Sequence, residues 1–178
     1  MRRFLDALYR GCGALAAVFV ALIAALVVAQ VGGRLVGVLV PGADDLASFA
    51  LTASAFLALA YTLRAGGHIR VTLLLNRAGA GQRRVLELWC LALAAGVTAY
   101  FAYYVVEMAW DAYRFGDRSV GVLPVPLWIP QSAMALGTVV LAVALVDDFV
   151  RVARGGEPSY QRAENRSAPE PAGPSPDR

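Results

Sequence analysis

The sequence predicts an all-α integral membrane protein with four transmembrane helices and both termini in the cytoplasm. Hydrophobic residues make up 58% of the chain and charged residues 16%, whereas soluble globular proteins average about 45–50% and about 25%. The apolar residues gather in four uncharged runs of about 18–20 residues. Each run can cross a hydrocarbon core of about 30 Å as a helix, which satisfies the backbone groups that lipid cannot pair. The four runs are residues 13–31, 46–63, 88–106 and 127–146.

The first run opens a membrane domain that we expect to cover residues 1–154. Arg2, Arg3 and Arg10 lie ahead of the run, which is also the arrangement at the start of a cleaved signal peptide. The run is longer than the apolar region of such a peptide, and a second run follows without a soluble domain. We therefore expect the first run to remain as a membrane span.

Small residues recur at four-residue spacing within three of the runs. Such stripes let another helix approach closely, which favours helix packing in lipid. An Ala-rich composition without structural meaning is the alternative. The stripes are Ala17–Ala21–Ala25–Ala29, Ala50–Ser54–Ala58 and Ala133–Gly137.

The chain enters the second run through a turn. Pro41-Gly42 is a turn signal, and Asp44 and Asp45 follow it. Both carboxylates are placed to cap the second helix and to stabilise its positive N-terminal end. A contact with a partner protein is the alternative role for them.

A basic loop, residues 64–84, joins the second run to the third. It holds five of the sixteen Arg, the single His and no acidic residue. Short positive loops stay in the cytoplasm, because moving Arg across an energised membrane is unfavourable. We expect the loop to contact anionic lipid or a partner subunit at the cytoplasmic membrane edge. The residues expected to do so are Arg64, His68, Arg70, Arg83 and Arg84.

A charged rim is expected at the opposite, outer edge of the membrane. Glu107, Asp111 and Arg114 lie on a polar helical extension of the third run, and Asp117 and Arg118 follow it. Glu107 and Asp111 share a helix face, which deep in the membrane would suggest a proton or cation path. At the edge we expect them to be solvated. The neighbouring rings are expected to form an interfacial belt: Tyr100, Phe101, Tyr103, Tyr104, Trp110, Tyr113 and Phe115.

The fourth run begins at a proline-rich segment and is followed by charged residues. Pro130 is tolerated in a first helical turn, where its missing N–H is no loss. Asp147 and Arg151 are spaced for an i,i+4 ion pair, and Glu87 is spaced for a surface pair with Arg83. Residues 155–178 are rich in Pro, Ser, Glu and Arg, which predicts a disordered cytoplasmic tail.

The distribution of Arg predicts the orientation. Thirteen of the sixteen Arg lie on the side of the N-terminus, the basic loop and the tail, and the other three are Arg34, Arg114 and Arg118. The positive-inside rule then places both termini in the cytoplasm. This clustering beside the spans also argues against nucleic-acid binding as the reason for the net charge of +3.

Motifs for catalysis and cofactors are missing from the sequence. A single His cannot supply two axial haem ligands or a histidine-based zinc site, and Cys12 and Cys90 are expected to be free thiols in a reducing compartment. No phosphate-binding loop, nucleophile elbow or zincin motif is present. We expect no enzyme activity, no cofactor and no metal. Gln30 and Gln131 are expected to form hydrogen bonds between helices.

One segment carries a family resemblance. The order of four spans, Asp44-Asp45 before the second span and Leu63-Arg64-Ala-Gly-Gly-His68-Ile69-Arg70-Val71 after it are similar to the small membrane subunit of tripartite ATP-independent periplasmic (TRAP) transporters. The entry Pro126-Leu-Trp128-Ile-Pro130 into the last span fits the same family. The resemblance covers about residues 5–152.

The resemblance implies a non-catalytic role in transport, as a multi-pass protein of the bacterial inner membrane. Small subunits of this kind brace the scaffold of a large permease subunit, whose moving part carries an organic acid together with sodium. A periplasmic substrate-binding protein delivers the substrate to the outer face. The side chains expected on that face are Asp44, Asp45, Glu107, Asp111, Arg114, Asp117 and Arg118.

Two other classes of function remain open. A free-standing four-helix carrier would need a buried charged site or a broken helix, and no acidic residue lies deep within a run. A membrane enzyme at the cytoplasmic lipid surface could bind phosphate through His68, Arg64 and Arg70. A lone His among Arg is more often a topology or lipid contact.

Overall fold

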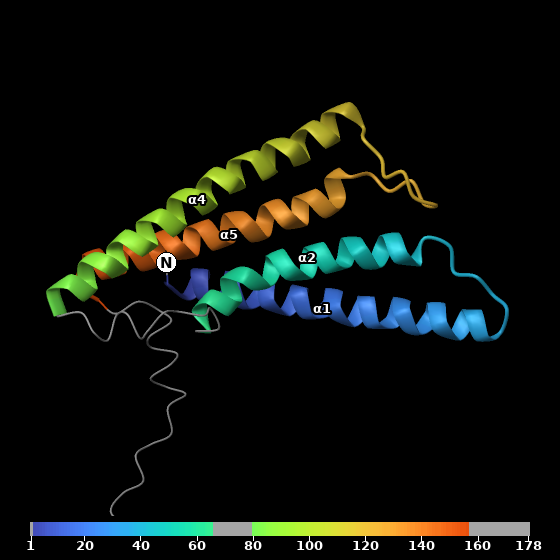
Figure 1. The fold of residues 1–178 in the computed structure, drawn as a ribbon, viewed down its shortest axis with the longest axis horizontal. Coiled ribbons are helices and arrows are strands. Elements are labelled where there is room, and N and C mark those ends of the chain that lie inside the picture. The colour runs from blue at the N-terminus through green and yellow to red at the C-terminus, as the bar shows by residue number, and fades with distance from the viewer. Residues whose placement is uncertain (1, 66–79, 157–178) are drawn as a thin grey trace, which may run out of the picture.

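The computed structural model describes residues 2–65 and 80–156, which form four long α-helices (Figure 1). All four helices are long and apolar enough to cross a membrane, and each coincides with one of the four predicted runs, although α5 begins one residue after the start of its run. The predicted fold class is therefore confirmed. The helices are α1 (Arg2–Leu35), α2 (Ala43–Arg64), α4 (Ala80–Phe115) and α5 (Trp128–Ala153).

The helices extend beyond the uncharged runs. α1 has 34 residues and α4 has 36, so each is about 50 Å long. Polar residues at a run's ends leave the lipid without ending the helix, because the backbone hydrogen bonds continue into the aqueous layer. α4 continues to Phe115 and contains the polar extension that the sequence predicts.

Glycines at positive φ end α1 and begin α2. At the end of α1, Gly37 has a φ of 76°, and the Val38 N–H donates to the Gly33 carbonyl at 2.8 Å, which is a Schellman arrangement. α2 begins at Gly42, with a φ of 73° and no side-chain capping bond. The prediction that Asp44 or Asp45 caps α2 is wrong. Both lie in its first turn, where their charge still stabilises the helix.

The four helices pack side by side in the order α1, α2, α5, α4 (Figure 1). α1 and α2 form one antiparallel pair, α4 and α5 form another, and α2 joins α5 between them. The outer helices α1 and α4 are therefore covered on one side only. We call the end with Arg64, Arg84 and Arg151 the basic end, and the end with Asp44 and Asp45 the acidic end.

α2 and α5 approach each other closely at a small residue of α5. A side chain at Gly137 of α5 would overlap the backbone of Phe56, and it would come within 2.8 Å of the Leu57 nitrogen. Ala50 and Ser54 of α2 are also buried. The predicted stripes of α2 and α5 thus pack against neighbouring helices. The stripe from Ala17 to Ala29 is exposed, so it does not pack against any of the described helices.

The continuous hydrophobic core lies toward the basic end. There Tyr9 and Cys12 of α1 pack with Leu63 of α2, Leu91 of α4 and Val152 of α5 in one cluster. Toward the acidic end α1 and α4 separate (Figure 1). The hydrophobic core therefore lies at the same end of the molecule as the charged residues of three helices.

Candidate functional site

Arg64, at the end of α2, joins three helices at the basic end. Its guanidinium donates to Asp6 Oδ1 of α1 at 2.8 Å and to Asp147 Oδ2 of α5 at 3.2 Å. The same group lies 4.6 Å from the centroid of the Tyr9 ring, and Tyr9 is only 2% exposed. A guanidinium suits this position because it is planar, has several donors and stacks on aromatic faces.

The C-terminal part of α5 completes this basic-end cluster, which we define as Asp6, Arg64, Asp147, Asp148 and Arg151. Arg151 donates to Asp147 Oδ2 at 2.8 Å, which confirms the i,i+4 pair predicted from the sequence. The Arg151 Nε lies 4.0 Å from Asp148 Oδ1, and Asp148 is 1% exposed. Charged groups at this depth are stable only when they are paired, so the cluster fixes the register of the helices.

Arg84 ties the start of α4 to the end of α5. Its Nη2 donates to the Ala153 carbonyl at 3.0 Å and to the Val152 carbonyl at 3.4 Å. These carbonyls lie in the last turn of α5, where a cation is favoured by the helix dipole. Arg84 therefore acts at least in part as an internal contact between helices.

The other predicted basic-loop residues are only partly placed. His68 and Arg70 lie outside the described residues, and Arg83 belongs to α4 but its side chain is not described. Glu87, which we expected on the surface, is 8% exposed and so is a buried residue of α4. The predicted contacts of the basic loop with lipid or a large subunit stay predictions.

At the acidic end, Asp44 and Asp45 contact their own chain. Gln30 of α1 donates from Nε2 to Asp44 Oδ1 at 2.8 Å, so its predicted role between helices is confirmed. The Asp45 carboxylate lies against Gly121, where a side chain would overlap it, and Leu123 packs over Gly42 in the same way. The segment between α4 and α5 is thus folded onto the start of α2.

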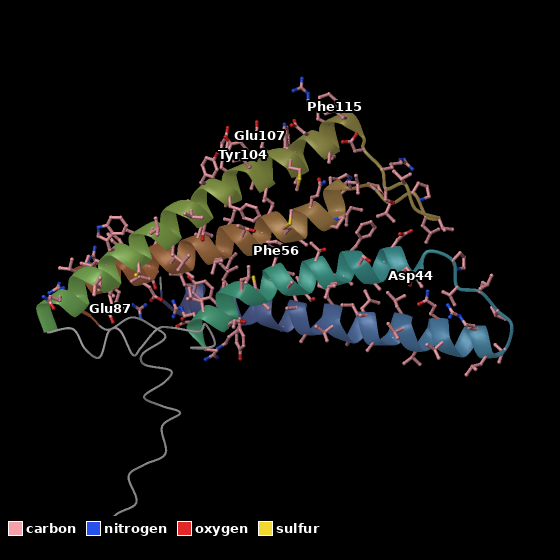
Figure 2. All side chains as sticks on the ribbon, viewed as in Figure 1. Asp44, Phe56, Glu87, Tyr104, Glu107 and Phe115 are labelled. Atoms are coloured by element: carbon pink, nitrogen blue, oxygen red, sulfur yellow. The ribbon has the colours of Figure 1, made fainter. Side chains whose placement is uncertain are left out.

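The remaining charges of the predicted rim do not gather with these two. Figure 2 shows Glu107 on the side of α4 away from α5, well apart from Asp44. Among the described residues, none of these five charged groups forms an ion pair, and all are exposed. They are Glu107, Asp111, Arg114, Asp117 and Arg118. The predicted rim therefore has two parts. Asp44 and Asp45 of α2 contact their own chain, whereas the charges on α4 and the following loop are exposed.

Comparison with known proteins decides the identity of the chain. Residues 23–155 match the family model described as the DctQ component of tripartite ATP-independent periplasmic transporters. This chain belongs to the DctQ family. No curated protein and no solved structure matches it. The DctQ assignment agrees with the resemblance drawn from residues 63–71 and covers all of α2, α4 and α5.

The DctQ assignment fixes the class of function. DctQ proteins are small permease subunits of TRAP transporters, so the chain is a multi-pass membrane component of a transporter and not an enzyme. DctQ components operate with a large permease subunit and a substrate-binding protein. The basic-end cluster and the acidic-end contacts are then the parts of a transporter subunit that fix its helices relative to one another.

Little in the sequence indicates the basic-end cluster as a whole. Asp6 and Tyr9 are single acidic and aromatic residues in a basic N-terminal segment, and no local pattern assigns them a partner. The available signal was three charged positions, Asp6, Arg64 and Asp147, each at the same membrane edge of a different span. Charges at the same depth on neighbouring spans are candidates for pairing, once the order of the spans is known.

Proposed function

We propose that this DctQ protein braces the scaffold of the large permease subunit in a sodium-coupled TRAP transporter for organic acids. It does so in the bacterial inner membrane with both termini in the cytoplasm. Its acidic end faces the periplasm and offers part of the docking surface for the substrate-binding protein. Its basic loop, including Arg64, His68, Arg70, Arg83 and Arg84, holds the cytoplasmic membrane edge by contacts with anionic lipid or the large subunit.

The observation that carries the proposal is the segregation of charge to the two ends of the described helices. Between Asp45 and Arg64 of α2, and between Trp128 and Val146 of α5, there is no Asp, Glu, Lys, Arg or His. The middle level is filled instead by close contacts such as Phe56 against Gly137. Carriers bind ionised solutes near the bilayer midplane through charged groups or broken helices. A rigid support for another subunit is therefore the role that these helices suit.

Sodium coupling and substrate class are tested by reconstitution of the complete system. The chain, the large permease subunit and the substrate-binding protein are placed in proteoliposomes, and uptake of labelled organic acids is measured. An inward sodium gradient should drive uptake, and an equal potassium gradient should not. Uptake that is indifferent to the cation would reject sodium coupling. Uptake of neutral or cationic solutes in preference to acids would reject the proposed substrate class.

A further inference from the structure

We propose that the face of α4 turned away from α5 is the surface on which a transmembrane helix of the large permease subunit docks. This inference rests on the proposed function, because it names the surface through which the chain braces its partner. We define this α4 seam as Trp89, Leu93, Gly96, Tyr100 and Tyr103.

The seam lies opposite the face that α4 uses within the chain. α4 buries Leu91, Ala95, Ala102 and Val105 on the side of its neighbours. At 100° per residue the seam residues lie on the other side of the helix. Their exposure agrees with this position, since Trp89 is 68% exposed, Tyr100 67% and Tyr103 64%.

The spacing of the seam is that of a helix-packing surface. Its members follow one another at intervals of four, three, four and three residues. The mean interval of 3.5 residues keeps the five residues in one stripe along α4. A partner helix that crosses α4 at a shallow angle can contact all of them.

Nothing in the described part of the chain requires a glycine at Gly96. Its position is helical, its φ is not positive, and a side chain built on it would meet no atom within 4 Å. Glycine inside a helix costs about 0.5–1 kcal/mol relative to alanine. A partner helix that approaches α4 closely at this point gives the glycine a function.

Tyr100 of the seam lies too deep for an interfacial belt. Phe101 stacks on Phe56 of α2 with ring centroids 6.4 Å apart, and Phe56 lies against Gly137 of α5. Phe56 is eleven residues from Asp45 and eight from Arg64, which places it near the middle of the apolar zone. Tyr100, the neighbour of Phe101, is therefore close to mid-membrane, and the expected belt begins only farther along α4.

The tyrosine hydroxyls also cannot be satisfied by lipid headgroups at the acidic end. Side chains on a helix lean toward its N-terminus, which for α4 is the basic end. The Tyr104 ring follows this rule, because it lies edge-on to Tyr100 at 4.8 Å and to Tyr103 at 5.2 Å. Figure 2 shows Tyr104 on the exposed side of α4. The three phenols can pair with one another only in part, and hydrocarbon offers them no hydrogen-bond partner, whereas a protein helix does.

Charge favours a different chain over a second copy of this one as the occupant. Glu107 and Asp111 continue the seam toward the acidic end and are both exposed. Two copies in the same membrane have the same orientation, so pairing through the seam would bring four carboxylates together. Like charges across an interface are unfavourable. A DctQ protein operates with a large permease subunit, and this subunit is the occupant to which we commit.

The test measures how much large permease subunit co-purifies with the tagged chain from membranes that contain both. Gly96→Leu fills the seam, and the Cβ that it adds meets no described atom within 4 Å. Gly32→Leu is the matched control, because Gly32 is also helical and exposed with no described atom within 4 Å of an added Cβ. Gly32 lies in the last turn of α1, beyond the apolar run, whereas Gly96 lies in the middle of its run. We expect Gly96→Leu to lower recovery of the large subunit about tenfold or more, as overpacking of a helix contact predicts. Gly32→Leu should leave it within about twofold of wild type.

Two further measurements complete the test. The double variant Tyr100→Phe and Tyr103→Phe keeps the rings and removes the hydroxyls, and we expect recovery to fall by about threefold or more, as for lost hydrogen bonds between membrane helices. A photo-crosslinking residue at Leu93 should label the large subunit. Labelling of lipid alone or of a second copy would overturn the inference, as would unchanged recovery with Gly96→Leu. Failure of the wild-type chain to recover any large subunit would instead reject the proposed function.

Discussion

Arg64 shows how a single side chain can hold three membrane helices in register. Its guanidinium bonds carboxylates of α1 and α5 while it stacks on Tyr9. Lysine has a single compact charge and no planar face, so it cannot reproduce this set of contacts. The residue is one-fifth exposed, which shields its bonds from much of the competition with water.

Arg64→Gln should lower the stability of the isolated chain. The substitution leaves Asp6 and Asp147 without this partner, and hydrogen bonds to charged groups are worth about 1.5–3 kcal/mol when they are partly buried. We expect a loss in this range in detergent unfolding, and a smaller loss for Arg64→Lys.

Arg10→Gln is the control for this prediction, because Arg10 is an exposed Arg of the same end. Its effect should stay within about 0.5 kcal/mol. Equal unfolding curves for Arg64→Gln and Arg10→Gln would show that the basic-end cluster contributes nothing particular to stability.

The sequence predicted the local member of this cluster and missed the distant ones. Asp147 and Arg151 are four residues apart, so helical periodicity alone pairs them. Asp6 and Asp147 are separated from Arg64 by 58 and 83 residues. No local rule connects such positions, and Arg64 was therefore expected to face lipid or a partner. The contact of Arg64 with lipid or a partner subunit remains a prediction, and Arg64 also bonds Asp6 and Asp147 within the chain.

At the scale of elements, the α2–α5 contact depends on one glycine. Gly137→Ala would place a methyl group against the backbone of Phe56, which cannot move without shifting α2. Overpacking of this kind costs about 1–3 kcal/mol. We expect that loss in detergent unfolding, while Gly32→Ala, in open space on α1, should be neutral or slightly stabilising. A neutral Gly137→Ala variant would contradict the close packing of α2 on α5.

The solvated part of the rim permits a separate prediction about the substrate-binding protein. Glu107 and Asp111 are exposed and beyond the apolar zone, whereas Asp44 is bonded to Gln30. Exposed charges tune encounter rate and register more than final affinity. Reversal of Glu107 and Asp111 to Lys should raise the concentration of binding protein needed for half-maximal uptake.

Salt distinguishes this effect from a loss of assembly. Exposed charges are screened over about 8 Å at physiological ionic strength, so the difference between wild type and the reversed variant should shrink as salt is raised. Identical uptake curves at low and moderate salt would leave Glu107 and Asp111 as solvated helix ends only.

The pattern of elements was largely predictable, but their lateral order was not. Uncharged runs of about 20 residues identify membrane helices because the hydrocarbon core sets their length. The same runs are apolar all round, so they do not indicate which side faces a neighbour. The stripe from Ala17 to Ala29 illustrates the difficulty: it resembles the packed stripes of α2 and α5, yet it is exposed.

At the scale of the whole molecule, the helices form an open layer that leaves α1 and α4 half uncovered. α1 begins and α5 ends at the basic end, as four spans require. Reporter fusions at Gly79 and after Arg154 should report the cytoplasm, and fusions near Pro41 and Gly121 should report the periplasm. The reason is that thirteen Arg lie on the side of the N-terminus, the basic loop and the tail, and three lie on the other side. A periplasmic signal at Gly79 would reverse the proposed orientation.

The central claim is that this DctQ protein supports transport without transporting by itself, and omission of single components tests it most directly. Proteoliposomes are prepared with the chain alone, with the large permease subunit and binding protein but no chain, and with all three. Uptake of the organic acid under a sodium gradient is measured in each. The account predicts uptake only with all three components. Uptake by the chain alone, or full uptake without it, would contradict the account.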